Sequence, residues 1–306
     1  MKTLRIGTRA SELALWQANL VKKLLAELGC DSSIVEISST GDEVLDKPLH
    51  QIGGMGLFTK TLDDAMFRGE IDIAVHSLKD VPTELPAGIV QAAVLKRAIE
   101  LDVIVYKNNT DFLTEEGTAT IATGSLRRKA QWLAKYPTHT ITGLRGNVNT
   151  RLRKLKENDW NGAVFAGAGL QRINLLPENH VVLDWMIPAP AQGAIMITAL
   201  GNDKEVLDLC AKINHESTEK AVWVERLFMR TLEGGCTAPI GGNAKIEGDT
   251  IHFKGILSDL DGKTNLTVQK SGPLSEYKTF GATCANEIIA EGGAVLMKKI
   301  KKEAKI

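Results

Sequence analysis

The strongest constraint on the fold is the regular alternation of apolar runs and helix-like patterns in the first two thirds of the chain. Residues 4–8 have the composition of a strand. Ser11 is placed to cap a following helix, whose apolar residues recur every three or four positions until Gly29. A helix over residues 57–67 and a strand over residues 72–77 come next. Strands that alternate with helices are typical of α/β domains with parallel sheets.

A second round of the same alternation begins near residue 101. Residues 118–123 and 163–166 predict strands, and residues 126–136 predict a helix between them. Residues 194–200 are apolar and β-rich, so they predict a strand that returns to the first sheet. The first 200 or so residues therefore predict two α/β units.

The last part of the chain has a different pattern. A helix near residues 218–232 precedes apolar residues that alternate with polar ones on both sides of Asp261-Gly262, which is a hairpin signal. A later helix is expected to stop at Gly292-Gly293 and to restart into a Lys-rich end. This pattern predicts a small α+β domain with an antiparallel sheet.

The fold class expected from these patterns is α/β, with two α/β domains and a small C-terminal α+β domain. We expect the first α/β domain to comprise residues 1–97 and 194–214. The second α/β domain is expected over residues 98–193, and the α+β domain over residues 215–306.

Composition excludes several classes of protein. None of the apolar runs in the 306 residues approaches the roughly 18 residues of a membrane helix, and the start does not resemble a secretory signal. The 37 Lys and Arg balance 37 Asp and Glu, so the molecule has no general attraction to nucleic acid. The four cysteines form no CxxC pair, which argues against disulfides and a cysteine zinc site. We expect a cytoplasmic protein, monomeric by default, with no nucleic-acid, membrane or metal partner.

Positive charge is concentrated in one stretch, residues 118–156, which has nine Lys or Arg and neither Asp nor Glu. Arg127 and Arg128 follow a predicted strand in the first turn of a helix, and Arg145 immediately precedes another helix. Cations at a helix start are unfavourable unless an anion is present, and Arg matches carboxylate or phosphate oxygens well. The stretch therefore predicts an anion site, and Arg9 with Ser11 repeats the pattern in the first domain. The alternative, a solvated basic helix face, is accepted for three of the other cations, Arg153, Lys154 and Lys156.

Lys79 and Asp80 stand side by side after the predicted strand of residues 72–77. Ligands of parallel α/β sheets bind at the carboxyl ends of strands, so these two side chains are expected near the bound anion. A lone carboxylate among cations is suited to stabilise a developing positive charge. The alternative is an exposed turn aspartate before Pro82. His76, in the same strand, is interpreted as a packed strand histidine.

Cys236 lies in the loop sequence LEGGCTAPIG. Neighbouring glycines leave space around the sulfur, so the loop is suited to present a thiol either as a nucleophile or as an attachment point. No histidine is obviously placed as a base for it. The other cysteines lie in or beside apolar helical patterns and are interpreted as buried bystanders; they are Cys30, Cys210 and Cys284.

Seven segments together resemble the porphobilinogen deaminase (hydroxymethylbilane synthase) family. They occur in the family's order and cover nearly the whole chain: RIGTRASELALWQ, GGMGLFTK, DIAVHSLKDVP, ATGSLRRKAQ, LRGNVNTRL, APAQGAI and LEGGCTAPIG. The resemblance implies two α/β domains similar to periplasmic anion-binding proteins and a third domain that carries Cys236. It also implies an enzyme that joins four porphobilinogen units head to tail, releases ammonia at each step and makes hydroxymethylbilane for haem biosynthesis.

The resemblance also implies a cofactor and roles for individual residues. A covalent dipyrromethane is expected on Cys236 through a thioether, and no metal, nucleotide or pyridoxal is required. Asp80 matches the catalytic aspartate. The residues expected to bind the cofactor or the growing chain are Lys79, Thr123, Ser125, Arg127, Arg128 and Arg172. The residues expected to bind the incoming substrate are Arg9, Ser11, Arg145, Arg151 and Gln192.

The chain departs from the family pattern in one loop, because Gln51 and Met55 stand where some members have lysine. A cationic grip from that loop is therefore not expected here, although its glycines are typical of a lid. Two other functions compete with the enzyme. A passive two-lobed anion-binding protein explains the arginines but leaves Cys236 unused, and a thiol-dependent acyl transferase lacks a base.

Overall fold

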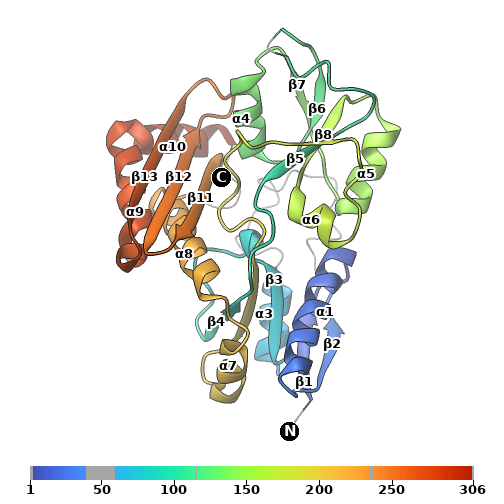
Figure 1. Ribbon diagram of the computed structural model, residues 1–306, viewed down its shortest axis with the longest axis vertical. Helices are drawn as coiled ribbons and strands as arrows, with labels where there is room; N and C mark the ends of the chain where they lie inside the picture. The colour runs from blue at the N-terminus through green and yellow to red at the C-terminus, as the bar shows by residue number, and fades with distance from the viewer. Residues whose placement is uncertain (1–2, 39–58, 115, 235–237, 305–306) are drawn as a thin grey trace. The chain divides into compact units, whose positions relative to one another are not determined.

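The computed structural model describes residues 3–38, 59–114, 116–234 and 238–304. The described residues up to Ala98, together with Gly193–Glu219, form one compact unit, called here the first unit. Ile99–Gln192 and the described residues from Lys220 onward form the second unit. Figure 1 traces the chain through both units. The predicted boundaries of three domains stay predictions.

The first unit is built around a mixed sheet of strands in the order β2-β1-β3-β10-β4 (Figure 1). Its elements are β1 (Leu4–Thr8), α1 (Glu12–Glu27), β2 (Ser32–Glu36), α3 (Lys60–Phe67), β3 (Ile73–Ser77), the 3₁₀ turn η2 (Leu78–Asp80), β4 (Ile89–Val94), β10 (Ile195–Leu200) and α7 (Lys204–Ala211). Helix α1 begins as predicted, because the Ser11 side chain accepts a hydrogen bond from the backbone N–H of Ala14. Val21 and Leu25 of α1 are buried in the core with strand residues such as Ile6.

The second unit begins with a sheet in the order β7-β6-β8-β5-β9. Its elements are β5 (Asp102–Tyr106), β6 (Thr120–Ala122), α4 (Leu126–Lys135), β7 (Thr140–Thr142), α5 (Val148–Glu157), β8 (Gly162–Ala166), α6 (Gly167–Arg172) and β9 (His180–Val182). Ile104 of β5 packs in one core with Trp132 of α4. Its neighbours Val103 and Val105 pack in another with Leu155 of α5. Helices therefore cover both faces of this sheet, as its apolar strands require.

The prediction of parallel sheets is wrong for one strand of each sheet. Strand β10 returns to the first sheet as predicted, but it runs antiparallel to both β3 and β4. Strand β5 likewise runs antiparallel to both β8 and β9. Hydrophobic periodicity identifies a strand but carries no information on its direction, which depends on where the chain re-enters the sheet.

The C-terminal part of the second unit is an antiparallel sheet in the order β11-β12-β13 with helices beside it (Figure 1). Its elements are α8 (Glu216–Thr231), β11 (Ile240–Glu247), β12 (Thr250–Ser258), β13 (Asn265–Pro273), the 3₁₀ turn η3 (Leu274–Glu276), α9 (Tyr277–Ile288), the π turn η4 (Ile289–Gly293) and α10 (Ala294–Ala304). The predicted hairpin turn is confirmed, with Gly262 at φ 73° between β12 and β13. The predicted break is confirmed at Gly292, whose φ of 104° interrupts the helical path.

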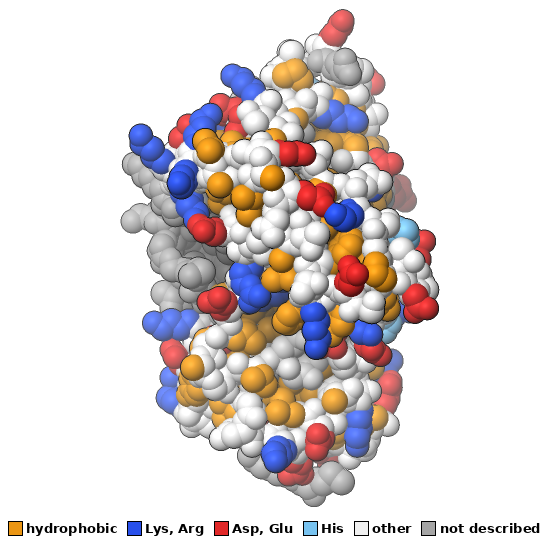
Figure 2. Space-filling view, turned by 90° about the vertical axis from the view of Figure 1, so that its left-hand side faces the viewer, with side chains coloured by type: hydrophobic (Ala, Val, Ile, Leu, Met, Phe, Trp, Pro, Cys, Tyr) orange, Lys and Arg blue, Asp and Glu red, His pale blue; other side chains and the backbone are white. Residues whose placement is uncertain are grey.

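No helix among the described residues is both long and apolar enough to cross a membrane. On the face that Figure 2 shows, Lys and Arg side chains are interspersed with Asp and Glu.

Candidate functional site: a buried arginine pair and its neighbours

Arg127 and Arg128 lie in the first turn of α4, as the sequence predicts, yet they are buried, with exposed fractions of 4% and 5%. The helix begins after Ser125, whose hydroxyl accepts a hydrogen bond from the backbone N–H of Arg128. The Thr123 hydroxyl in turn accepts one from the backbone N–H of Ser125 at 3.3 Å. Two hydroxyl groups predicted to contact the cofactor therefore also shape the turn that presents the arginines.

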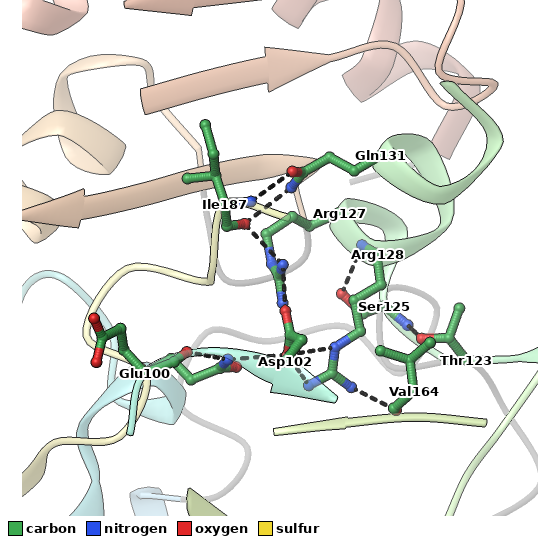
Figure 3. A network of polar contacts seen from close by, with 10 residues as sticks. Glu100, Asp102, Thr123, Ser125, Arg127, Arg128, Gln131, Val164 and Ile187 are labelled. Carbon is green, nitrogen blue, oxygen red and sulfur yellow. Dashed lines mark hydrogen bonds and ion pairs between the residues drawn. The ribbon is translucent and has the colours of Figure 1, made fainter. Parts of the chain in front are cut away.

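The anion that faces these arginines is Asp102, the fully buried first residue of β5 (Figure 3). Its Oδ1 accepts hydrogen bonds from Nε and Nη2 of Arg128 at 3.0 and 2.7 Å. Its Oδ2 forms an ion pair with Nη1 of Arg127 at 2.8 Å. Arg128 also donates from Nη1 to the carbonyl of Val164 at 3.0 Å. The anion that the sequence required at this helix start is thus supplied by the chain itself, and the three side chains keep one net positive charge.

The electrostatics of this group follow from its burial. Burial alone would raise the pKa of Asp102, but the charges of Arg127 and Arg128 and the hydrogen bonds from Arg127 and Gln192 hold that pKa far below its usual range. Burial also lowers the pKa of Arg127, and the charge of Asp102 opposes that shift. Arg127 Nε is buried without a hydrogen-bond partner among the described residues. This guanidinium therefore keeps a donor for a further acceptor.

Residues 185–192, the segment that ends at Gln192, are attached to the group formed by Arg127, Arg128 and Asp102. Gln131 of α4 donates from Nε2 to the carbonyl of Ile187 at 3.0 Å and accepts from its N–H at 2.8 Å (Figure 3). Arg127 Nη1 donates to the same carbonyl at 2.9 Å. Gln192 is fully buried, and its Nε2 donates to the carbonyl of Glu100 at 2.7 Å and to Asp102 Oδ1 at 2.9 Å. The predicted substrate residue Gln192 therefore lies on the carboxylate that orients the arginines.

Arg145 lies at the next junction of strand and helix, between β7 and α5, and Arg151 lies near the start of α5. Arg145 is half-buried, burial lowers its pKa, and its Nε has no hydrogen-bond partner among the described residues. Arg151 donates from Nε to the carbonyl of Gly146 at 2.7 Å. A Cβ on Gly124 would lie 2.6 Å from the carbonyl oxygen of Leu144, so glycine is needed where these two junctions meet.

The solvated-face interpretation is confirmed for two of the three cations further along α5. Arg153 and Lys156 are exposed, and Arg153 pairs with Glu157 across one helical turn. For Lys154 the interpretation is wrong, because its Nζ donates to the carbonyl of Arg145 at 3.2 Å. Lys154 therefore supports the loop that carries Arg145.

The predicted site residues of the first unit cluster where β1 and β3 end. The side chain of Ser11 caps α1, and Arg9, in the same loop, is half-buried. Lys79 and Asp80 are half-buried in η2, directly after β3. Gln17 of α1 donates from Nε2 to the hydroxyl of Ser77 at 2.8 Å, which ties α1 to the start of η2.

His76 is a packed strand histidine, as predicted. It is buried on β3, and its Nε2 lies 3.2 Å from the hydroxyl oxygen of Thr198. Burial, and secondly the charge of Arg9, lower its pKa to about 4, so the imidazole is neutral at pH 7.

Arg172 ends the short helix α6 and is half-buried. Burial lowers its pKa to about 10, which leaves it a cation at neutral pH.

Cys236, Gln51, Met55 and the Gly53–Gly56 loop lie outside the described residues. The described chain ends just before Cys236 at Glu233-Gly234, where Glu233 has a left-handed φ of 53°. A Cβ on Gly234 would lie 2.1 Å from Cδ1 of Ile240, so a side chain at this position requires the Ile240 side chain to shift. The bystander interpretation of the other cysteines is confirmed, since all three are buried: Cys30, Cys210 and Cys284.

Sequence reasoning missed Asp102 and Gln131. A signal for Asp102 was available, because it is an acid at the start of an otherwise apolar strand, and buried carboxylates need cationic or hydrogen-bonding partners. Nothing in the sequence distinguished Gln131 from a polar residue on the outside of a helix. Within the described residues, no group of three or more His, Cys, Asp or Glu is placed to hold a metal ion.

Similarity to known proteins extends over nearly the whole chain. Residues 4–208 match the family domain described as porphobilinogen deaminase, dipyromethane cofactor binding domain, and residues 220–290 match porphobilinogen deaminase, C-terminal domain. A porphobilinogen deaminase of Campylobacter hominis is 41% identical over 309 residues, covering 99% of this chain and 100% of that protein. One from Pelotomaculum thermopropionicum is 42% identical over 306 residues, covering 99% and 98%. Among solved structures, the periplasmic VFT2 domain of Bordetella pertussis BvgS is 10% identical, with a TM-score of 0.41 over 69% of this chain and 86% of that one.

These matches define an enzyme of tetrapyrrole biosynthesis that acts on a small molecule, porphobilinogen. The chain belongs to the porphobilinogen deaminase family. The expectation of a dipyrromethane cofactor is confirmed by the matched cofactor-binding domain. The expected fold class is confirmed as well, with the correction to strand direction given above.

Proposed function

We propose that the chain joins four porphobilinogen molecules head to tail into the linear tetrapyrrole hydroxymethylbilane and releases ammonia at each addition. We further propose that a dipyrromethane primer is attached through a thioether to Cys236. The observation that carries the proposal is the buried pair Arg127 and Arg128, whose charge Asp102 neutralises only in part, inside a stretch that matches a cofactor-binding domain. The chain is proposed to be cytoplasmic and to work as a monomer. Light scattering on the purified protein tests the monomeric state.

The residues present fit a carboxylate-rich cofactor. Each pyrrole unit carries an acetate and a propionate, and guanidinium forks pair well with carboxylates. Arg127 Nε is a buried donor without a partner among the described residues, and Asp102 leaves one net positive charge on the pair. When bound, the dipyrromethane supplies the free pyrrole α-carbon at which chain growth begins. The side chains proposed to hold its carboxylates or those of the growing chain are Lys79, Thr123, Ser125, Arg127, Arg128 and Arg172.

The incoming substrate is proposed to bind a second set of side chains. Arg145 has a buried Nε without a partner among the described residues, which suits a substrate carboxylate. Gln192 bonds to Asp102 and so links this set to the arginine pair. The side chains proposed to bind porphobilinogen are Arg9, Ser11, Arg145, Arg151 and Gln192.

Asp80 is proposed as the catalytic carboxylate. The amino group of the aminomethyl substituent leaves as ammonia with the electron pair of the broken C–N bond. The methylene carbon stays on the ring, so positive charge develops on the pyrrole. A carboxylate held beside the pyrrole N–H stabilises this charge, and the half-buried position of Asp80 reduces competition from water. Removal of a preorganised group of this kind commonly lowers turnover by about 10²–10³-fold.

The test of the proposal is the intact mass of the purified protein beside that of a Cys236→Ala variant. A mass excess of two linked pyrrole units in the unchanged protein, absent from the variant, is the expected result. An unmodified protein that also stays unmodified after incubation with porphobilinogen would contradict the proposal and favour a passive anion-binding protein.

Asp80→Asn separates the two functions further. The enzyme should keep the cofactor mass in this variant and lose most of its turnover, measured as hydroxymethylbilane formed. A passive binder should tolerate the substitution.

A further inference from the structure

Glu225 is a buried carboxylate that the proposed chemistry does not use. It lies on α8 with an exposed fraction of 0%. Its Oε2 accepts a hydrogen bond from the backbone N–H of Ala191 at 2.6 Å, and its Oε1 accepts one from Ala244 at 2.7 Å. One side chain therefore joins helix α8, strand β11 and the segment that leads to Gln192.

Ala191 has a backbone conformation that alanine rarely adopts. Its φ is 63°, in the left-handed region that favours glycine, and the residue is fully buried. Such a conformation persists only where surrounding contacts enforce it, and the hydrogen bond to Glu225 is one of these contacts. The next residue, Gln192, directs its amide onto Glu100 and Asp102. The turn at Ala191 therefore determines where the Gln192 side chain points.

The same segment is also held a few residues earlier. The backbone N–H of Gly242 in β11 donates to the carbonyl of Pro188 at 2.9 Å. A Cβ on Gly241 would lie 2.8 Å from the carbonyl oxygen of Ile187, so β11 approaches the segment as closely as glycine permits. Gln131 and Arg127 of α4 form hydrogen bonds with the backbone of Ile187 (Figure 3). The segment is thus fastened to the arginine pair on one side and to the C-terminal sheet on the other.

We propose that Glu225 is a positioning residue for the proposed reaction. By holding Ala191 in its left-handed conformation, it places Gln192 against Asp102 and thereby sets the orientation of Arg127 and Arg128. A contact made by helix α8, in the C-terminal part of the second unit, in this way controls the geometry of the anion-binding group. The inference rests on the proposed function in one respect, the binding of pyrrole carboxylates by Gln192 and the arginines.

Glu225→Gln tests this proposal, because an amide accepts only one of the two backbone N–H groups and presents its own N–H to the other. Loss of a hydrogen bond to a charged group commonly changes the equilibrium constant of the process that needs it by roughly tenfold or more. We expect about tenfold faster hydrogen exchange over residues 185–192, about a tenfold rise in the KM for porphobilinogen, and a kcat within about twofold. Glu225→Asp, which keeps the charge and shortens the reach, is measured by the same criteria where the amide variant does not fold.

Two further variants make the test specific. Val224→Ala weakens the same helix in the C-terminal core without touching the segment, so it should leave the exchange of residues 185–192 and the KM unchanged. Glycine adopts a left-handed φ without cost. Adding Ala191→Gly to Glu225→Gln should therefore lower the raised KM most of the way back to that of the unchanged protein.

The outcomes separate the inference from the function on which it rests. Unchanged exchange in Glu225→Gln, or a KM shift no larger than that of Val224→Ala, would overturn the positioning role in an active enzyme. A double variant as impaired as Glu225→Gln would overturn the part assigned to Ala191. A wild-type protein that forms no linear tetrapyrrole would instead overturn the proposed function, whatever the exchange shows.

Discussion

Replacing Asp102 by Asn tests the electrostatic account of the arginine pair. The carboxylate receives Nε and Nη2 of Arg128, Nη1 of Arg127 and Nε2 of Gln192, all within 3.0 Å. Asparagine keeps the shape but loses the charge, and its amide N–H₂ is directed at one of these donors. Removal of one partner from a buried ion pair leaves an uncompensated charge, which commonly costs about 3–5 kcal/mol. We expect Asp102→Asn to lower the free energy of unfolding by this amount at pH 7.

The measurement is urea unfolding followed by circular dichroism, at pH 7 and at lower pH. The arginine charges lower the pKa of Asp102 below its ordinary value of 3.8, so its stabilising contribution is complete above about that pH and is lost as the pH falls further. The difference between the variant and the unchanged protein should therefore shrink only in strong acid. Glu157→Gln, which breaks the exposed pair with Arg153, is the control and should cost no more than about 0.5 kcal/mol. A loss below about 1 kcal/mol in Asp102→Asn would refute the reasoning.

Three further predictions concern other charged residues. Burial raises the pKa of Asp63 from 3.8 to about 6, so folding favours its neutral form. This contribution to the stability of the fold is complete below about pH 4 and is lost as the pH rises through 6. Asp63→Asn should raise the free energy of unfolding at pH 7 by up to about 3 kcal/mol and by much less at pH 4, and a gain equal at both would contradict this. Arg145→Ala should raise the KM for porphobilinogen by about tenfold or more, and full activity would count against its role. Lys79→Ala should lower the fraction of protein that carries the cofactor mass, and complete loading would remove Lys79 from the cofactor set.

Local features of the fold were predictable because they depend on residues close together in the sequence. The strand of residues 4–8 and the Ser11 cap follow from apolar spacing and side-chain chemistry within a few positions. The Asp261-Gly262 turn follows from the ease with which glycine adopts a positive φ. The direction of β10 and β5 was not predictable in this way, since it depends on partners far along the chain.

The candidate site was predictable in its residue types but not in its connections. The cations at the start of α4 required an anion, and the sequence reasoning looked for it in a ligand. The fold places Asp102 there first, because β5 lies next to β8 and begins beside α4. In the sequence, nothing distinguishes Glu225 from other charged residues on a predicted helix. Only the fold shows that its carboxylate accepts hydrogen bonds from two backbone N–H groups.

The sequence by itself determined the order of strands and helices, the family and the set of side chains proposed to carry the chemistry, because these depend on local spacing and on motifs. The tertiary structure alone decided the strand directions, the counterion of the arginines and the hold of Glu225 on Ala191. Those features arise from contacts between residues far apart in the sequence. Arg128 and Gln192, for example, lie 26 and 90 positions from Asp102. Such contacts form only when the whole chain packs and buried polar groups must find partners.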